Sequence, residues 1–140
     1  MNLSQDLQIS VSVADQEALD VVLPHAARRG LGVIAKRPIA NAAWRTGSKP
    51  SNGYHQEYWR RMRELDYDFL RRPLPESIAT ALRFTLSVAG VHTAIVGTTN
   101  AERWRENAAL LARGPLGAAE LDAIHRRWRE IAREDWIGQT

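Results

Sequence analysis

The sequence has 140 residues, of which 44% are hydrophobic and 25% charged, and this size and composition suit one domain with one core. It contains no cysteine, which excludes disulfides and thiolate metal sites, and its nineteen basic residues exceed the sixteen acidic ones by only three. No apolar run approaches the roughly 20 residues that a membrane span needs, and the start "MNLSQDLQ" lacks the charged and apolar segments of a signal peptide. We therefore expect a single domain over residues 1–140 that is cytoplasmic and contacts no membrane.

Seventeen of the basic residues are arginines, and nine of these fall in two segments, "YWRRMRELDYDFLRR" and "HRRWREIARED". Both segments mix the arginines with acidic and aromatic residues at helical spacing. Solvated helix faces explain this mixture without a nucleic acid, and the sequence shows no helix-turn-helix, zinc-finger or RNA-binding motif. We expect the arginines to face solvent and expect no nucleic-acid partner.

The first part of the chain predicts two strands. Residues 7–13 alternate apolar and polar side chains with the period of a strand, and residues 31–36 form a short apolar run typical of a strand buried on both faces. Between them, residues 15–30 have helical spacing, with Pro24 marking either a kink or a late start and Gly30 the end. The turn-forming residues that dominate 37–53 predict an irregular loop.

The next part predicts two helices. Residues 54–71 carry an apolar stripe at helical spacing, followed by two prolines. The stripe consists of Tyr58, Met62, Leu65 and Phe69. A second helix is predicted over residues 75–90, because Pro75 suits a first helical turn and Gly90 suits a helix end.

The last part predicts a third strand and two more helices. Residues 92–97 are the strand, and Thr99 and Glu102 fit a capping box that opens a helix over residues 101–113. The final helix has an apolar stripe made of Leu121, Ile124, Trp128 and Ile131. Strands separated by helices imply parallel strands with right-handed crossovers, so the predicted fold class is α/β.

Two junctions between strands and helices are chemically rich, and parallel α/β folds gather ligands at such junctions. The first is "KRPIAN", residues 36–41, and the second is "VGTTNAERWREN", residues 96–107. At the second, the unpaired N–H groups and the dipole of a helix start favour an anion. Thr98 and Thr99 can donate hydrogen bonds to phosphate oxygens, Arg103 can pair with a phosphate or stack on a ring, and Asn107 can meet a base edge.

The same junction also admits a purely structural interpretation. Thr99 is a routine N-cap, Gly97 a routine turn residue, and Arg103 and Glu106 can simply face solvent. Spacing alone leaves both interpretations open, because the sequence has no Gly-x-Gly-x-x-Gly or Walker-type loop.

Three segments, "GLGVIAKRPIANAAWR", "ALRFTLSVAGVHTAIVGTTN" and "ERWRENAALL", together resemble the C-terminal part of a bacterial aldo/keto reductase. The resemblance runs from about residue 7 to the last helix, and its most specific element is a strand followed by Gly-Thr-Thr-Asn and then Arg-x-x-Glu-Asn. This family is a (β/α)8 barrel that reduces carbonyls with NAD(P)H. The resemblance therefore implies an α/β fold that is a partial (β/α)8 TIM barrel of about three βα units, with residues 7–13, 33–36 and 93–96 as the sixth to eighth parallel strands and with flanking helices.

The resemblance also implies a binding region for NADP(H) or NAD(H). Residues 97–99 would line the site of the adenosine-side phosphate, Arg103 would contact that phosphate or the adenine ring, and Glu106 and Asn107 would meet the adenine edge. Many family members have Lys or Arg where this chain has Gly97, so the sequence does not distinguish NADP from NAD.

The loop after the second predicted strand would complete that region. By the resemblance, Arg37, Pro38 and Ile39 fall where the seventh-strand loop passes the pyrophosphate. The family's catalytic Asp, Tyr, Lys and His come from earlier strands and have no match here, so we expect the catalytic tetrad to be absent. Any activity would need a new proton donor, and Tyr54 and His55 in this loop are the candidates.

The four histidines, at positions 25, 55, 92 and 125, lack metal-ligand spacing, and we expect surface or packing roles for them and no metal site. Three strands cannot close an eight-stranded barrel. Open strand edges and the apolar face meant for the barrel interior would be exposed, so we expect a homodimer or higher homo-oligomer. Two alternatives to a cofactor-binding fragment stay open: a non-catalytic oligomeric structural or interaction protein, and an unrelated activity in a cleft at the subunit interface.

Overall fold

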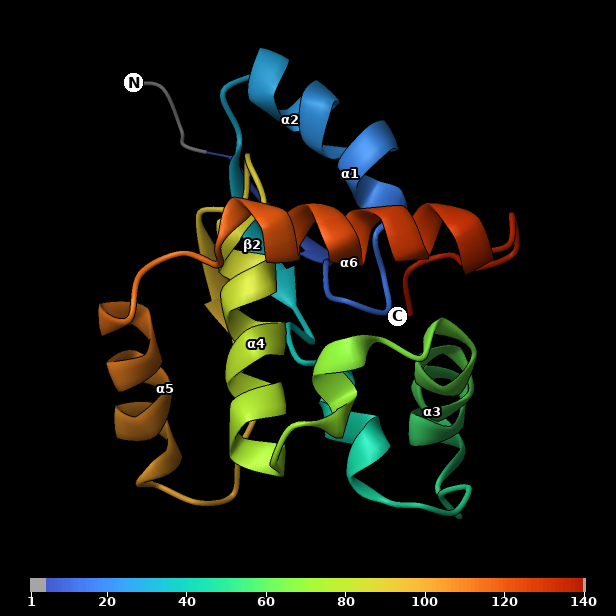
Figure 1. Cartoon of the computed structure of the whole chain (residues 1–140). Helices are drawn as coiled ribbons and strands as arrows, with labels where there is room; N and C mark the ends of the chain where they lie inside the picture. The colour runs from blue at the N-terminus through green and yellow to red at the C-terminus, as the bar shows by residue number, and fades with distance from the viewer. Residues whose placement is uncertain (1–4, 140) are drawn as a thin grey trace.

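The structure, a computed structural model, describes residues 5–139. Three strands form one parallel sheet in the order β1–β2–β3, with β1 at Asp6–Ser10, β2 at Gly32–Lys36 and β3 at Thr93–Ile95. All five residues of β1 pair with β2, whereas the shorter β3 pairs with the last three residues of β2. Helices connect the successive strands (Figure 1). The predicted α/β class with three parallel strands is confirmed.

The first crossover consists of two short helices, α1 (Glu17–Val21) and α2 (Leu23–Arg28). Pro24 lies in the first turn of α2, so the proline ends one helix and opens the next. The strand expected over residues 7–13 is wrong at its end, because β1 stops at Ser10. Ser12 and Asp15 instead bond to each other through their backbones at 3.0 and 3.1 Å, which turns the chain away from the sheet.

The second crossover contains η1 (Ala40–Arg45), α3 (Gly53–Leu65), η2 (Asp68–Arg71) and α4 (Leu74–Ser87). The helix expected over residues 54–71 is too long, because Asp66 takes a left-handed conformation with φ 42° and ends α3. Phe69 of the predicted stripe is still buried, but from η2. The next helix also ends earlier than expected, at Ser87 rather than Gly90, since Val88 is already extended.

Two helices follow β3, α5 (Arg103–Ala112) and α6 (Ala118–Ile131). The predicted capping box at the start of α5 is wrong, because no side chain caps this helix. Two side chains instead stabilise the turn before α5. The Oγ1 atom of Thr98 accepts from the N–H of Asn100 at 3.1 Å, and the Oδ1 atom of Asn100 accepts from the N–H of Glu102 at 3.0 Å.

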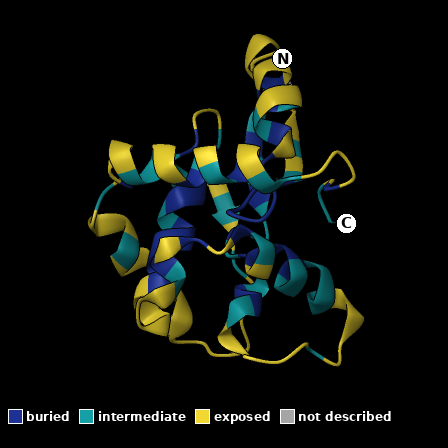
Figure 2. Ribbon diagram, turned by 45° about the vertical axis from the view of Figure 1, so that its right-hand side comes forward, coloured by how far each residue is buried: buried dark blue, intermediate teal, exposed yellow. Residues whose placement is uncertain are grey.

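The core lies between the sheet and the surrounding helices, with exposed residues on the outer faces (Figure 2). The helix α6 crosses the C-terminal end of α4, where Phe84 meets His125 with ring centroids 5.2 Å apart (Figure 1). The chain after α6 returns to the core. Trp136 is only 1% exposed, and the centroid of its ring lies 5.5 Å from that of Trp128. The segment of residues 132–139, called the tail below, is therefore part of the folded unit.

The arginines of α3 do not all behave as predicted. Arg63 is exposed, as expected, but Arg61 is 1% exposed and lies among the largest fully buried side chains. A helical pattern places both on α3, and only tertiary contacts decide which of them meets solvent.

Candidate functional site

A cleft of about 930 Å³ lies at the C-terminal ends of β2 and β3. Gln8, Lys36 and Ile95 of the three strands line it. The strand register places Gln8, Lys36 and Ile95 on one face of the sheet, whereas the buried Val33 and Ala35 of β2 point to the other face. The cleft therefore lies on the sheet face opposite the helix-covered core. The other walls are the loop after β2 with η1, the start of α3, and the loop from β3 to α5. This is the end of a parallel sheet at which α/β folds bind ligands.

The charge of this cleft is of one sign. Among the described residues that line it, none is acidic and four are cationic, namely Lys36, Arg37, Arg45 and Arg103. A second cleft, of about 710 Å³ between η2 and α6, is lined by four arginines and also by four acidic residues. Because opposite charges cancel in the second cleft, only the first favours an anionic ligand.

The structure brings most of the sequence-predicted site residues together in this cleft. Its lining includes Arg37, Pro38, Ile39, Gly97, Thr98, Thr99 and Arg103, together with Tyr54 and His55. Glu106 and Asn107 lie further along α5 and do not line it; Glu106 forms an ion pair with Arg103 at 3.5 Å, and Asn107 is half-buried. The binding roles of all these residues stay predictions.

The loop after β2 has an unusual backbone. Four non-glycine residues within six positions have positive φ: Arg37 at 54°, Ala40 at 47°, Asn41 at 56° and Ala42 at 47°. Such conformations cost on the order of 1–3 kcal/mol each and persist only where surrounding contacts determine them. One such contact is the hydroxyl of Thr85 on α4, which donates to the carbonyl of Pro38 at 2.7 Å. This hydrogen bond ties the loop to α4.

Four polar residues of the cleft were not singled out from the sequence as site residues. They are Gln8, Asn41, Arg45 and Asn100. Among residues 5–139, four buried side-chain polar atoms lack a hydrogen-bond partner, and two of these, Nδ2 of Asn41 and Nδ1 of His55, belong to cleft residues. Unsatisfied buried polar groups are costly, so a ligand that bonded to them would gain free energy. Asn41 stands in the first chemically rich junction, which is the one signal in the sequence that points to it.

The two candidate proton donors share one wall of the cleft. The rings of Tyr54 and His55 have centroids 5.4 Å apart in an edge-to-face arrangement. The guanidinium of Arg37 lies 4.4 Å from the centroid of the Tyr54 ring, which suits a cation–π contact. A phenol, an imidazole and a guanidinium therefore face the same space.

A buried acidic residue lies behind this wall. Asp15, in the loop after β1, is 2% exposed, and the hydroxyl of Tyr58 on α3 donates to its Oδ2 atom at 2.5 Å. Burial raises the pKa of Asp15 to about 6, although the hydrogen bond from Tyr58 and the charge of Arg61 act to lower it. Burial, followed by the charge of Asp15, also raises the pKa of Tyr58 well above its ordinary value, so this hydroxyl stays protonated.

The raised pKa of Asp15 predicts a pH-dependent stability. The pKa of Asp15 is about 6 in the folded protein and 3.8 in the unfolded chain, so the folded state binds the proton more tightly. The resulting contribution to the free energy of unfolding is complete below about pH 4 and is lost as the pH rises through 6. Urea unfolding of the wild type and of Asp15→Asn, at pH 4.5 and pH 7, measures this contribution. The wild type should lose stability relative to the variant on going to pH 7, by about 3 kcal/mol at most. An equal pH dependence in the two proteins would contradict the assignment.

Three of the histidines have a hydrogen-bond partner. On the surface, Nδ1 of His25 lies 3.1 Å from the guanidinium of Arg28. Nδ1 of His92 accepts from the N–H of Val33 at 3.0 Å, and Nδ1 of His125 lies 2.8 Å from the side-chain oxygen of Gln16. Burial lowers the pKa of His125, followed by the charge of Arg129. No group of three or more His, Asp or Glu residues that could hold a metal ion occurs within residues 5–139. The helices of this same range are all too short or too polar to cross a bilayer.

No protein-family model and no curated protein sequence matches the chain. Among solved structures, the chain is similar to aldo-keto reductase AKR11C1 from Bacillus halodurans. The apo form superposes with a TM-score of 0.71 and 20% identity over 96% of this chain and 47% of the enzyme. The holo form gives a TM-score of 0.67 and 21% identity over 94% and 45%. The chain thus spans about half the length of that enzyme, and residues 5–139 have the fold of part of an aldo-keto reductase barrel, as the sequence resemblance implies.

Proposed function

We propose that the cleft binds the phosphate-bearing part of a nicotinamide dinucleotide, NADP(H) or NAD(H). The observation that carries the proposal is a cleft with four cationic side chains and no acidic one among its described lining residues, at the C-terminal ends of parallel strands. The fold shared with an aldo-keto reductase, a protein that has also been solved in a holo form, supports the same ligand class.

The cleft residues suit this ligand. Thr98 and Thr99 line the cleft from the loop after β3, Arg37 lines it from the loop after β2, and Arg103 lines it from the start of α5. Hydroxyl and guanidinium groups are strong donors to phosphate oxygens, and the guanidinium binds them in pairs. In this proposal Arg103 contacts the adenosine-side phosphate or the adenine ring, Glu106 and Asn107 meet the adenine edge, and the pyrophosphate lies along residues 37–39.

The proposed reaction class is carbonyl reduction, in which a bound nicotinamide supplies hydride. The chain would have to give a proton to the carbonyl oxygen, and the donors that line the cleft are the hydroxyl of Tyr54 and the imidazole of His55. Because Tyr54 is 52% exposed, a substrate can reach its hydroxyl from solvent.

A fluorescence titration with NADPH tests the binding proposal. We expect saturable enhancement of the cofactor emission in a well-folded sample, and no binding at millimolar NADPH would refute it. A search for NADPH oxidation with small aldehydes, repeated with Tyr54→Phe and with His55→Ala, then tests the proton donors separately from binding.

A second candidate function is that of an oligomeric structural protein, favoured by exposed apolar side chains on α5 and β3. The helix α5 has no buried residue, and Trp104, Ala108 and Leu111 form an exposed stripe at helical spacing, with Trp104 62% and Leu111 55% exposed. Ile95 of β3 is also 51% exposed, and no strand among residues 5–139 pairs with the outer edge of β3. In this second proposal, two copies of the chain associate through this edge and stripe.

Charge substitution in the stripe should disrupt such a dimer. We expect wild-type protein to scatter light as a defined homo-oligomer and Trp104→Glu to be monomeric, because a carboxylate would be buried in an apolar contact. Val21→Glu is a matched control, since Val21 is 64% exposed on α1. Arg103→Ala should leave the oligomer intact. A wild-type protein that is monomeric at all concentrations would exclude this second function.

A further inference from the structure

A chain of buried polar side chains connects the tail to the wall of the cleft. Its centre is Asp15, which accepts the hydrogen bond from Tyr58 described above, and both residues are almost completely buried, at 2% and 0% exposure. Neither residue lines the cleft.

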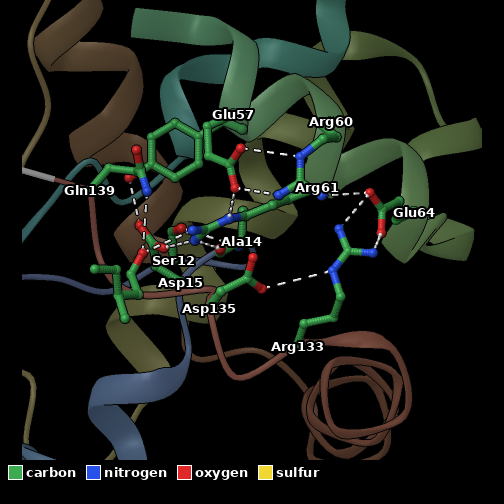
Figure 3. Close-up of polar contacts among 12 residues, drawn as sticks. Ser12, Ala14, Asp15, Glu57, Arg60, Arg61, Glu64, Arg133, Asp135 and Gln139 are labelled. Carbon is green, nitrogen blue, oxygen red and sulfur yellow. Dashed lines mark hydrogen bonds and ion pairs between the residues drawn. The ribbon is translucent and has the colours of Figure 1, made fainter.

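Asp15 is held on its other side by an arginine. The guanidinium of Arg61 donates to Oδ1 of Asp15, to the carbonyl of Ala14 at 3.1 Å and, through Nε, to Glu57 at 2.8 Å (Figure 3). The tail closes this arrangement, because Arg61 also donates to the carbonyl of Ile137 at 2.9 Å and the N–H of Gln139 bonds to Asp15. The carboxylate therefore has little freedom to move.

Tyr58 links the fixed carboxylate of Asp15 to a residue of the cleft. Its hydroxyl donates a hydrogen bond to Asp15, and the guanidinium of Arg37 acts on the same hydroxyl, through hydrogen bonding and its charge, to lower the pKa of Tyr58. Because the acceptor of the phenol is a carboxylate, the phenolic oxygen becomes a better acceptor for the guanidinium. Of the connected side chains Arg61, Asp15, Tyr58 and Arg37, only Arg37 lines the cleft, where its guanidinium also lies over the ring of Tyr54.

We propose that Asp15 and Tyr58 are positioning residues that hold the guanidinium of Arg37 in the orientation that binds the anionic group of a ligand in the cleft. For a dinucleotide this inference rests on the proposed function, but the fixed orientation of Arg37 is a property of the free protein. An arginine side chain loses much rotamer freedom on binding, and fixing it in advance removes that cost from the ligand.

Removing the phenolic oxygen alone tests the chain of contacts. Tyr58→Phe keeps the buried ring and should weaken NADPH binding about fivefold to tenfold, as expected for one lost hydrogen bond. Tyr67→Phe is the matched control, because Tyr67 is also buried and its hydroxyl donates to the carbonyl of Val13 at 2.7 Å, while its pKa, which burial raises, responds to Gln16 and Arg127 instead of Arg37. This control should bind NADPH like the wild type.

A double-mutant cycle shows whether Tyr58 acts through Arg37. Arg37→Met should weaken binding by itself, and adding Tyr58→Phe to it should change nothing further. If Tyr58→Phe still weakens binding in the Arg37→Met background, Tyr58 has a general structural role and the inference is wrong.

The free protein supplies a readout that needs no ligand. The Nε–Hε group of Arg37, identified in NMR spectra by its loss in Arg37→Met, should be ordered in wild type and in Tyr67→Phe and mobile in Tyr58→Phe. Asp15→Asn, a second variant should Tyr58→Phe not fold, should also mobilise it. If NADPH fails to bind the wild type, the proposed function fails while this comparison still decides the inference. An Arg37 side chain that stays equally ordered in both variants would overturn it.

Discussion

Replacing Arg61 by methionine should destabilise the folded chain by about 3–5 kcal/mol. The guanidinium is 1% exposed and pairs with a carboxylate that is 2% exposed, so its removal leaves the charge of Asp15 buried without its cationic partner. The same change removes the bonds of the guanidinium to Glu57 and to the tail carbonyl of Ile137. Against a typical domain stability of about 5–15 kcal/mol, the variant should be marginally folded.

Urea unfolding followed by tryptophan emission measures this effect. Arg71→Met is the control, because Arg71 pairs with Asp66 and Asp68 at 61% exposure, and exposed pairs contribute about 0–1 kcal/mol. Adding Asp15→Asn to Arg61→Met should recover part of the loss, since the uncompensated charge is then gone. An Arg61→Met protein as stable as Arg71→Met would show that the buried pair does not hold the tail.

Reversing the charge of Arg103 should weaken NADPH binding about 100-fold, if the cleft binds the phosphates as proposed. The change replaces a guanidinium–phosphate contact by repulsion, and loss of a charged hydrogen-bonded partner is worth about 2–5 kcal/mol, where 1.4 kcal/mol is tenfold. Arg103 is suited to this role because it lines the cleft and is 48% exposed, with one ion pair to Glu106.

Arg105→Glu is the matched control for Arg103→Glu. Arg105 lies on the same helix, is 67% exposed and pairs with Glu102 at 3.4 Å, but does not line the cleft. We expect its reversal to change the dissociation constant less than threefold, which is the size of a long-range charge effect screened by salt. Equal losses in the two variants would mean that general attraction, and not a contact in the cleft, holds the ligand. Comparing NADPH with NADH in Arg103→Glu shows whether Arg103 meets the adenosine-side phosphate.

The local elements of the fold could be predicted because their patterns are short. The apolar run before Lys36 and the stripe of Tyr58, Met62 and Leu65 gave a strand and a helix close to those observed. The ends were less predictable. Asp66 stops α3 by adopting φ 42°, a conformation that no periodicity encodes, and α5 starts without the side-chain cap predicted from Thr99.

The candidate site was predictable to the extent that it follows strand ends. Residues 37–39 and 97–99 both follow parallel strands, and the ends of parallel strands meet at one edge of a sheet. Tyr54 and His55 also reach this edge because the loop after β2 folds back over it. Gln8 was missed because it lies within a strand, and nothing in the strand pattern says which polar side chain faces an open cleft.

The sequence alone determined the order of strands and helices, because hydrophobic patterns extend over only a few residues. The alternation of strands and helices in turn implied a parallel sheet, in which the two junctions at the strand ends line one cleft. The tertiary structure alone decided which charges are buried. Asp15 and Tyr58 are 43 positions apart, and Arg61 meets a tail carbonyl 76 positions away. Such contacts depend on how crossovers bring distant segments together, and the burial that raises the pKa of Asp15 exists only once they have met.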